Sequence, residues 1–250
     1  MAKKQETKSR RQAVREQRLK RQRQQRLITI LVVAGVAIII AGFLIYPSLQ
    51  RSMAPVGEVV QITPVVRPEG EGVALGDPAA PVLVEVWSDF QCPACRNYAE
   101  GVEPLVLANY VANGKARYVY RHYPFLDDGS LSKESDQAAH ASMCAADQGR
   151  FWDYHDILFA NWNGENIGSF RDKRLIAFAE ALNLDMDQFS ACFNEGNHDE
   201  EINKDLADGN RAGVSGTPSV FVNGKILTPG RVPSFEDIAA AIDAASTSGN

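Results

Sequence analysis

Cysteine and histidine are both scarce in this chain of 250 residues, with four of each. Cys92 and Cys95 are closely spaced, whereas Cys144 and Cys192 stand alone. The four histidines form no paired spacing: His122, His140, His155 and His198. A structural zinc site needs four ligands, which usually come as two closely spaced pairs. The sequence therefore argues against a metal site.

Charge of either sign is missing from residues 27–46, and aromatic side chains are missing from residues 1–26. The first 26 residues hold eleven Lys or Arg and two acidic residues, a net charge of +9, whereas the rest of the chain carries −14. A basic tail without aromatic side chains has nothing to stack on bases. Because it adjoins an apolar run, we expect it to contact anionic lipid and to orient the chain, and we expect no nucleic-acid partner.

Residues 27–46 predict one transmembrane helix, because twenty residues of helix span about 30 Å, the thickness of the hydrocarbon core of a bilayer. The positive-inside rule places residues 1–26 in the cytoplasm and residues 47–250 outside it, as in a single-pass protein of the cell membrane. The alternative is a cleaved signal peptide. Its basic segment would be unusually long, and its nearest small-residue site, Ser52-Met53-Ala54, precedes Pro55. We therefore expect an uncleaved anchor.

Residues 47–72 contain four prolines and three glycines and no hydrophobic period. This composition predicts a flexible linker that tethers the rest of the chain to the membrane. Residues 73–250 are sufficient for one domain.

Within residues 73–250, short β-branched and aromatic runs indicate strands, and apolar residues at helical spacing indicate helices. Asn223-Gly224, between two such runs, is a strong hairpin signal. The predicted elements are an edge strand at 73–75, a central strand at 82–87, a helix at 92–113 kinked near Pro104, a strand at 116–121, a helical block at about 127–212, strands at 219–222 and 225–227, and a helix at 233–246. This order predicts an α/β thioredoxin fold with a helical insertion.

Cys92-Pro93-Ala94-Cys95 follows the predicted central strand and opens the predicted helix. At a helix N-terminus, unpaired backbone N–H groups and the helix dipole favour a thiolate. A thiolate beside a second thiol can attack a disulfide and be released by its neighbour, so the motif predicts thiol–disulfide exchange. An inert bridge is the alternative, although so short a loop adds little stability. Of the three pairings that four cysteines allow, sequence proximity favours Cys92 with Cys95.

Two segments carry a family resemblance: Asp89-Phe90-Gln91-Cys92-Pro93-Ala94-Cys95, and Gly213-Val214-Ser215-Gly216-Thr217-Pro218 ahead of a strand and the hairpin. On the basis of these two segments, residues 73–245 resemble the DsbA-like thiol–disulfide oxidoreductases, specifically their membrane-anchored bacterial branch. The resemblance implies that Cys92 is an exposed nucleophile and Cys95 a deeper resolving thiol. It also implies a cis peptide bond before Pro218, which places the Thr217 backbone where it pairs with an extended client segment.

The resemblance also implies roles for Glu85 and for the second pair of cysteines. Glu85 interrupts an apolar strand and resembles the acidic residue that relays protons to the buried cysteine; a partly exposed structural Glu is the alternative. The segment from Glu85 to Cys92 is one residue longer than in the best-known members. Because a shift of one residue moves a strand side chain to the other face of the sheet, the sequence leaves open which face Glu85 occupies. Cys144 and Cys192 resemble a second disulfide found in some members, with two buried free thiols as the alternative.

The expected function is oxidation of exported client proteins that carry thiols. The resemblance implies reoxidation by a quinone-linked membrane protein of DsbB or vitamin K epoxide reductase type, and it implies no cofactor. A disulfide isomerase or reductase with the same site is the alternative, because Ala94 stands where the reference oxidase has His, and Thr217 where it has Val. A non-catalytic extracytoplasmic binding module is a third possibility, which the intact pair of cysteines disfavours.

The histidines predict no catalytic role. His155 lies on an apolar helical face with Phe151 and Leu158, where a core histidine is expected. His198, inside a polar segment, is expected in a solvated loop. A Cys–His hydrolase built on Cys92 would have no need of Cys95.

Overall fold

The computed structural model describes residues 2–53, 55–127, 132–229 and 231–248. The chain divides into two compact units, Met1–Pro55 and Val56–Asn250. Ala54 of the disfavoured cleavage site and residues 128–131 of the predicted insertion lie outside the described residues.

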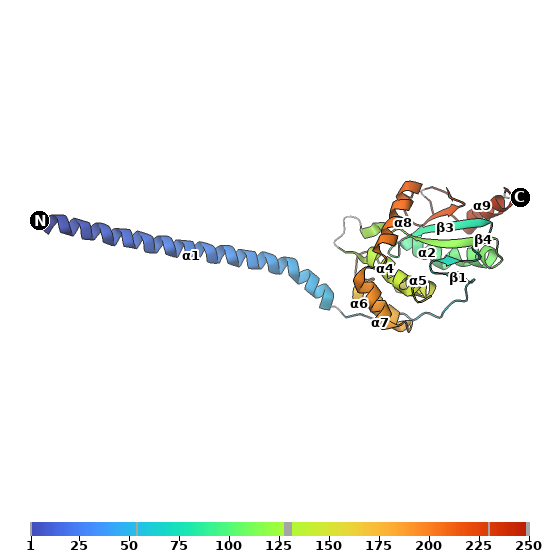
Figure 1. Cartoon of the computed structure of the whole chain (residues 1–250), viewed down its shortest axis with the longest axis horizontal. Helices are drawn as coiled ribbons and strands as arrows, with labels where there is room; N and C mark the ends of the chain where they lie inside the picture. The colour runs from blue at the N-terminus through green and yellow to red at the C-terminus, as the bar shows by residue number, and fades with distance from the viewer. Residues whose placement is uncertain (1, 54, 128–131, 230, 249–250) are drawn as a thin grey trace. The chain divides into compact units, whose positions relative to one another are not determined.

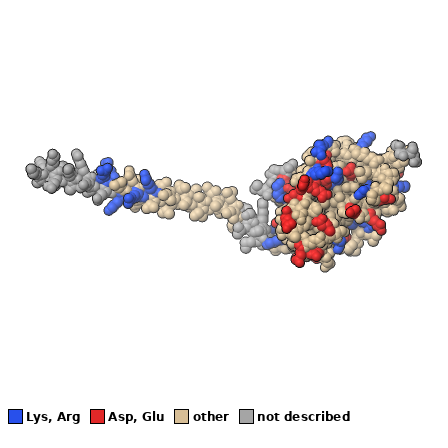
Figure 2. Space-filling view, in the orientation of Figure 1, with Lys and Arg blue, Asp and Glu red and all other residues tan. Residues whose placement is uncertain are grey.

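The first unit is the helix α1 (Ala2–Met53). Its segment Arg18–Tyr46 is long and apolar enough to cross a membrane, and none of its apolar window is buried inside the protein. Figure 2 shows basic side chains on this helix followed by an uncharged band. The helix is therefore consistent with the predicted membrane anchor at residues 27–46.

The second unit is built on a six-stranded sheet with the order β1-β2-β4-β3-β5-β6 (Figure 1). Its strands are β1 (Gly70–Glu71), β2 (Ala74–Leu75), β3 (Val82–Ser88), β4 (Ala116–His122), β5 (Ser219–Val222) and β6 (Lys225–Ile226). β3 and β4 are parallel, and the other neighbouring pairs are antiparallel. The predicted α/β thioredoxin fold is confirmed, and the two central strands are those that the apolar runs indicate.

The two faces of β3 meet different helices, because successive side chains of a strand point in opposite directions. Val84 and Val86 pack with residues of α9 (Phe235–Ser248) on one face. Trp87 packs on the other face, beside α8 (Asp199–Ala212). The face on which a β3 side chain lies therefore decides which residues it can reach.

The predicted helix at 92–113 is interrupted near Pro104. It consists of α2 (Pro93–Gly101), α3 (Glu103–Val106) and a π-helical turn, η1 (Leu107–Val111). Pro104 lacks a backbone N–H and occupies the first turn of α3, where that loss is tolerated. The kink expected from the sequence is confirmed.

The helical block between β4 and β5 starts with a short turn, η2 (Phe125–Asp127). It continues with α4 (Glu134–Ala146), α5 (Phe151–Ala160), α6 (Asp172–Ala181), α7 (Met186–Glu195) and α8. The Asp185 side chain caps α7 by accepting hydrogen bonds from the backbone N–H groups of Asp187 and Gln188, as its position predicts. His155 is buried on α5, as expected for a core histidine.

The hairpin between β5 and β6 turns at Asn223 and Gly224, where the sequence predicts it. Their φ angles are 47° and 73°. Positive φ at both central residues is the geometry that twists two antiparallel strands correctly, and Asn-Gly adopts it at low cost. The Asn223 side chain also accepts a hydrogen bond from the backbone N–H of Leu83, 2.8 Å away, which ties the turn to β3.

Residues 56–69, which the sequence predicts as part of a flexible linker, are bonded to the globular unit. The buried Asn161 side chain donates to the Val60 carbonyl and accepts from the Val60 N–H, at 2.9 and 2.8 Å. Arg174, also buried, donates to the Val56 carbonyl at 2.7 Å. The stretch differs from the prediction because its backbone groups bond to polar side chains of the helical block, a pairing that its composition does not indicate.

Gly209 on α8 should not tolerate a side chain. A Cβ atom there would lie 2.7 Å from the Trp87 indole and 2.9 Å from the Tyr123 ring. We expect Gly209→Ala to lower the free energy of unfolding by about 1–3 kcal/mol through overpacking. Denaturant unfolding of the full chain in detergent measures it. Gly101→Ala is the matched control, because a Cβ there meets nothing within 4 Å; equal losses for both variants would contradict this packing.

Candidate active site at the N-terminus of α2

Cys92 occupies the N-cap position of α2, directly after β3 and a short turn. Its backbone N–H donates to the Asp89 carbonyl at 3.0 Å, and its carbonyl accepts the first helical bond, from Arg96, at 3.1 Å. Pro93 follows in the first turn, where its fixed φ suits the start of a helix. The backbone N–H groups of Ala94 and Cys95 are thereby left to face the Cys92 sulfur.

The pKa of Cys92 is lowered to about 6. The largest cause is a hydrogen bond from the Cys95 thiol, and the Thr217 hydroxyl and the N–H groups of Cys95 and Ala94 add to it. Burial opposes these contributions. Near pH 7 the Cys92 sulfur is therefore mainly a thiolate, which is the nucleophilic form.

Cys95 has the opposite environment. It is 1% exposed, and its burial raises the pKa of its thiol well above the ordinary value. The Cys92 sulfur raises it further, whereas hydrogen bonds with Ser88 and Thr217 oppose the shift. A thiolate and a neutral thiol thus stand side by side, as the predicted nucleophile and resolving thiol require. Cys92 itself is only 7% exposed, so it is more enclosed than the resemblance implies.

Thr217 and Pro218 lie against the cysteines, although they are more than a hundred residues away in sequence. The Thr217–Pro218 peptide bond is cis. The Thr217 carbonyl oxygen is 3.4 Å from the Cys92 Sγ. The structure therefore brings together the four residues Cys92, Cys95, Thr217 and Pro218 that the sequence proposes for one site.

Glu85 lies apart from that site. Its carboxylate pairs with the Arg121 guanidinium at 3.3 Å, and Arg121 also pairs with Asp205 of α8 at 2.7 Å. Glu85 alternates along β3 with Val84 and Val86, so it lies on the face of the sheet away from their partners. The structure does not bring Glu85 and Cys95 together. Ser88, at the end of β3, is the strand residue that contacts the Cys95 thiol.

A buried polar network holds the turn before Cys92, and the sequence does not predict it. The Gln91 amide is fully buried and donates to Asp127 at 3.2 Å and to Ser135 at 2.8 Å. Asp89 accepts from the Gln91 N–H and the Ser135 hydroxyl, both at 2.8 Å. Burial raises the pKa of Asp89 to about 7. The active-site turn is thereby fixed to the start of α4.

Trp162 completes this support. Its indole N–H donates to the Gln91 carbonyl at 2.6 Å, and the Arg96 guanidinium lies 5.7 Å from the centre of its ring. Gln91 and Trp162 carry no chemistry of their own, which is why reasoning from reactive residue types misses them. Gln91 lies within the segment from Glu85 to Cys92, whose extra length is the one sequence signal that this turn is unusual.

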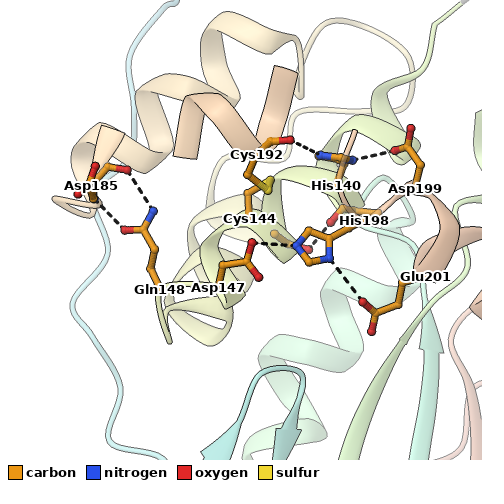
Figure 3. Close-up of a disulfide and its surroundings, with 11 residues drawn as sticks. His140, Cys144, Asp147, Gln148, Asp185, Cys192, His198, Asp199 and Glu201 are labelled. Carbon is orange, nitrogen blue, oxygen red and sulfur yellow. Dashed lines mark hydrogen bonds and ion pairs between the residues drawn. A yellow bond between two sulfur atoms is a disulfide. The ribbon is translucent and has the colours of Figure 1, made fainter. Parts of the chain in front are cut away.

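Cys144 of α4 and Cys192 of α7 form a disulfide (Figure 3). Both are buried, at 0% and 4% exposure, and they join two helices of the block. This is the second disulfide that the resemblance to DsbA-like proteins implies. His198 differs from its prediction: it is half-buried at the N-cap of α8, because its ring pairs with Asp147 at 2.9 Å.

The chain is similar in sequence and in structure to proteins of a known family. A family model described as Thioredoxin matches residues 69–244, so the chain belongs to the thioredoxin family. The oxidised BdbD structure from Bacillus subtilis superimposes with a TM-score of 0.63 at 20% identity, covering 72% of this chain and 98% of that one. The fold expected from the sequence is thereby confirmed.

The chain covers very different shares of two curated relatives. The probable disulfide bond formation protein D of Bacillus cereus is 29% identical over 174 residues, 68% of this chain and 76% of that protein. The Na(+)/H(+) antiporter NhaA 1 of Salinispora arenicola is 34% identical over 182 residues, which are 72% of this chain but 26% of the antiporter. The chain thus spans about a quarter of the length of the first curated relatives it matches. The resemblance to DsbA-like thiol–disulfide oxidoreductases is confirmed.

The low pKa of Cys92 predicts the pH dependence of its reactivity. In the reduced chain, alkylation by iodoacetamide should accelerate as the pH rises through about 6, where the thiolate forms, and should level off above it. Thr217→Val removes a hydroxyl that lowers the pKa of Cys92, so it should raise the midpoint. Cys95→Ala removes the largest contribution and should raise it further.

The exposed residue Ser215, two positions from Thr217, supplies the control for this series. Ser215→Ala should leave the midpoint unchanged. An ordinary cysteine midpoint in the unmodified chain, or equal shifts for Thr217→Val and Ser215→Ala, would contradict the assignment.

Proposed function

We propose that this protein is an extracytoplasmic thiol–disulfide oxidoreductase that introduces disulfides into exported proteins through Cys92 and Cys95. The observation that carries the proposal is the asymmetry of the two sulfurs. Cys92 is held as a thiolate at the N-cap of α2, whereas Cys95 is buried as a thiol. A structural disulfide or a non-catalytic binding module does not require two sulfurs with different pKa values, whereas thiol–disulfide exchange does.

The exchange begins when a client thiolate attacks the Cys92 sulfur of the oxidised pair. The S–S bond breaks, and Cys95 leaves with the electron pair and takes up a proton, because its pKa is high. A second client thiolate then attacks the client sulfur of the mixed disulfide. Cys92 leaves as a thiolate, and its pKa of about 6 makes it a good leaving group. The client loses two electrons and the pair of cysteines gains them.

Recognition of clients is assigned to the loop around Thr217. Its carbonyl lies at the Cys92 sulfur, where an extended client backbone can donate to it. Main-chain pairing is independent of client sequence, which suits an enzyme with many clients. A cavity of about 1220 Å³ in the described part of the globular unit is lined by residues such as Glu103, Leu107 and His155 and by neither cysteine of the pair. That cavity is therefore separate from the loop to which client binding is assigned.

The proposed location rests on the charge of the N-terminal segment and on the Cys144–Cys192 disulfide. The net charge of +9 on residues 1–26 favours the cytoplasmic side for that end of α1, and residues 47–250 then lie outside the cytoplasm. The Cys144–Cys192 disulfide is supporting evidence, because disulfides persist mainly outside the cytoplasm. The reoxidising partner belongs to the same proposal: a quinone-linked membrane protein of DsbB or vitamin K epoxide reductase type.

Trapping of clients tests the mechanism. Cys95→Ala cannot resolve a mixed disulfide, so the full chain with this change should accumulate covalent complexes that a reductant releases. Cys92→Ala should accumulate none, because the nucleophile is missing. Nonreducing electrophoresis and mass spectrometry identify the captured proteins, which should be exported ones. Trapping by neither variant would overturn the mechanism, and capture of cytoplasmic clients alone would overturn the location.

The reduction potential separates an oxidase from a reductase with the same site. A thiolate pKa of about 6 lies between the values of about 3.5 for DsbA and about 7 for thioredoxin, so we expect a potential between about −120 and −270 mV. Equilibration of the full chain with glutathione, followed by alkylation of Cys92 and Cys95, measures it. A value nearer the DsbA end supports the oxidase. A value at or below that of thioredoxin would favour the reductase.

A further inference from the structure

The disulfide between α4 and α7 lies among histidine and carboxylate side chains that the redox site does not use. His140 and Cys144 are four residues apart on α4, so they lie on the same face of that helix. Cys192 reaches them from α7, and His198 from the start of α8. Two histidines and two cysteines from three helices thus converge on one place (Figure 3).

The distances among the possible ligand atoms are short. One ring nitrogen of His140 and the sulfurs of Cys144 and Cys192 all lie within 4.8 Å of one another. A carboxylate oxygen of Asp147, the Cys192 sulfur and a ring nitrogen of His198 meet the same limit. Cys192 belongs to both groups and therefore links His140 to His198.

The surroundings of His140 resemble those of a metal ligand. Its Nδ1 is 2.8 Å from a carboxylate oxygen of Asp199, and its Nε2 lies on the side of Cys192, 3.2 Å from the Cys192 carbonyl oxygen. Metal-binding histidines usually hold one ring nitrogen on a carboxylate, which orients the other nitrogen toward the ion. His198 has a carboxylate at each ring nitrogen, with Asp147 2.9 Å from Nε2 and Glu201 3.5 Å from Nδ1, so zinc at one of these nitrogens would replace its carboxylate while the other orients the ring.

We propose that the reduced form of this cluster binds one zinc ion through His140, Cys144, Cys192 and His198. Two thiolates and two imidazoles are a common tetrahedral set for zinc. The disulfide form cannot supply this set, because both sulfurs are bonded to each other. The cluster therefore has two covalent states, a disulfide when oxidised and a zinc site when reduced, and each state connects α4 to α7.

The conversion balances with a dithiol as the reductant. The dithiol attacks the Cys144–Cys192 bond and becomes a disulfide, and its two electrons and two protons give the thiols of Cys144 and Cys192. Zinc then displaces the two thiol protons to solvent and forms two Zn–S bonds. The resulting Zn(II) dithiolate carries no net charge, which suits a buried position better than a free cation.

The sequence argues against a metal site because it shows no two closely spaced pairs of ligands. His140 and Cys144 form a mixed pair at helical spacing, and the fold brings Cys192 and His198 to them from α7 and α8. The cluster is therefore assembled from distant residues that no pair of like ligands in the sequence indicates.

Zinc binding by the full chain in detergent tests the proposal. Cys92→Ser and Cys95→Ser are introduced first, so that the redox pair cannot bind the metal. After reduction with a phosphine and its anaerobic removal, competition with a chromophoric chelator should show one zinc ion per chain. The oxidised protein should bind zinc no more tightly than a variant that also carries Cys144→Ser and Cys192→Ser. Cobalt should give the charge-transfer band of thiolate ligands in the reduced protein alone.

Three single variants test whether the histidines take part in zinc binding or whether the two thiols alone account for it. Asp199→Asn changes a residue that only orients His140, and it should weaken zinc binding by about 10- to 100-fold. His140→Gln removes a ligand and should weaken it more. His155→Gln, a buried histidine outside the cluster, is the control and should leave the affinity unchanged.

The proposal is overturned if the reduced chain binds zinc no more tightly than the variant without Cys144 and Cys192. It is also overturned if His140→Gln and His155→Gln have equal affinities, because two thiols alone would then account for the binding. Circular dichroism reports whether each variant is folded. If His140→Gln unfolds, Asp199→Asn decides in its place, since the Asp199 side chain is 68% exposed.

Discussion

The hydrogen bonding of the Cys92 sulfur is the interaction on which the site depends. A thiolate there is stabilised by the Cys95 thiol, by the Thr217 hydroxyl and by backbone N–H groups of the first turn of α2. Each donor comes from a different constraint: the spacing of the two cysteines, the loop before β5 and the start of a helix. Their sum outweighs the cost of enclosing a charged sulfur that is only 7% exposed. Cys95 keeps its proton, because burial and the Cys92 sulfur raise the pKa of its thiol by more than its hydrogen bonds with Ser88 and Thr217 lower it.

Holding that sulfur in place requires support from the helical block. Gln91 and Asp89 are buried polar residues, and a buried polar group without a partner would be costly. Ser135 at the start of α4 and Asp127 of η2 satisfy them. The insertion therefore does more than cover the sheet, because it fixes the backbone that leads into α2. Trp162 adds a bond to the Gln91 carbonyl from the loop after α5.

The sheet separates two kinds of chemistry. On one face, the end of β3 supports the cysteines through Ser88. On the other face, Glu85, Arg121 and Asp205 form a cluster of charges beneath α8. Strand alternation alone produces this separation, since neighbouring residues of β3 point in opposite directions. The disulfide of the helical block is a third centre, and its surrounding histidines and carboxylates distinguish it from a simple covalent link between helices.

The sequence by itself determined the elements of the fold and the chemistry of the nucleophile. Apolar strands, the Asn223-Gly224 turn and a cysteine pair at the start of a helix are local signals, because neighbouring residues produce them. Only the tertiary structure decided what depends on distant residues: the placement of Thr217 at the sulfur, the burial of Gln91 and the bonding of residues 56–69 to the domain. It also decided the face of Glu85 and the convergence of His140 with Cys192. These contacts join segments far apart in the chain, and no local pattern encodes which side chains meet when helices pack.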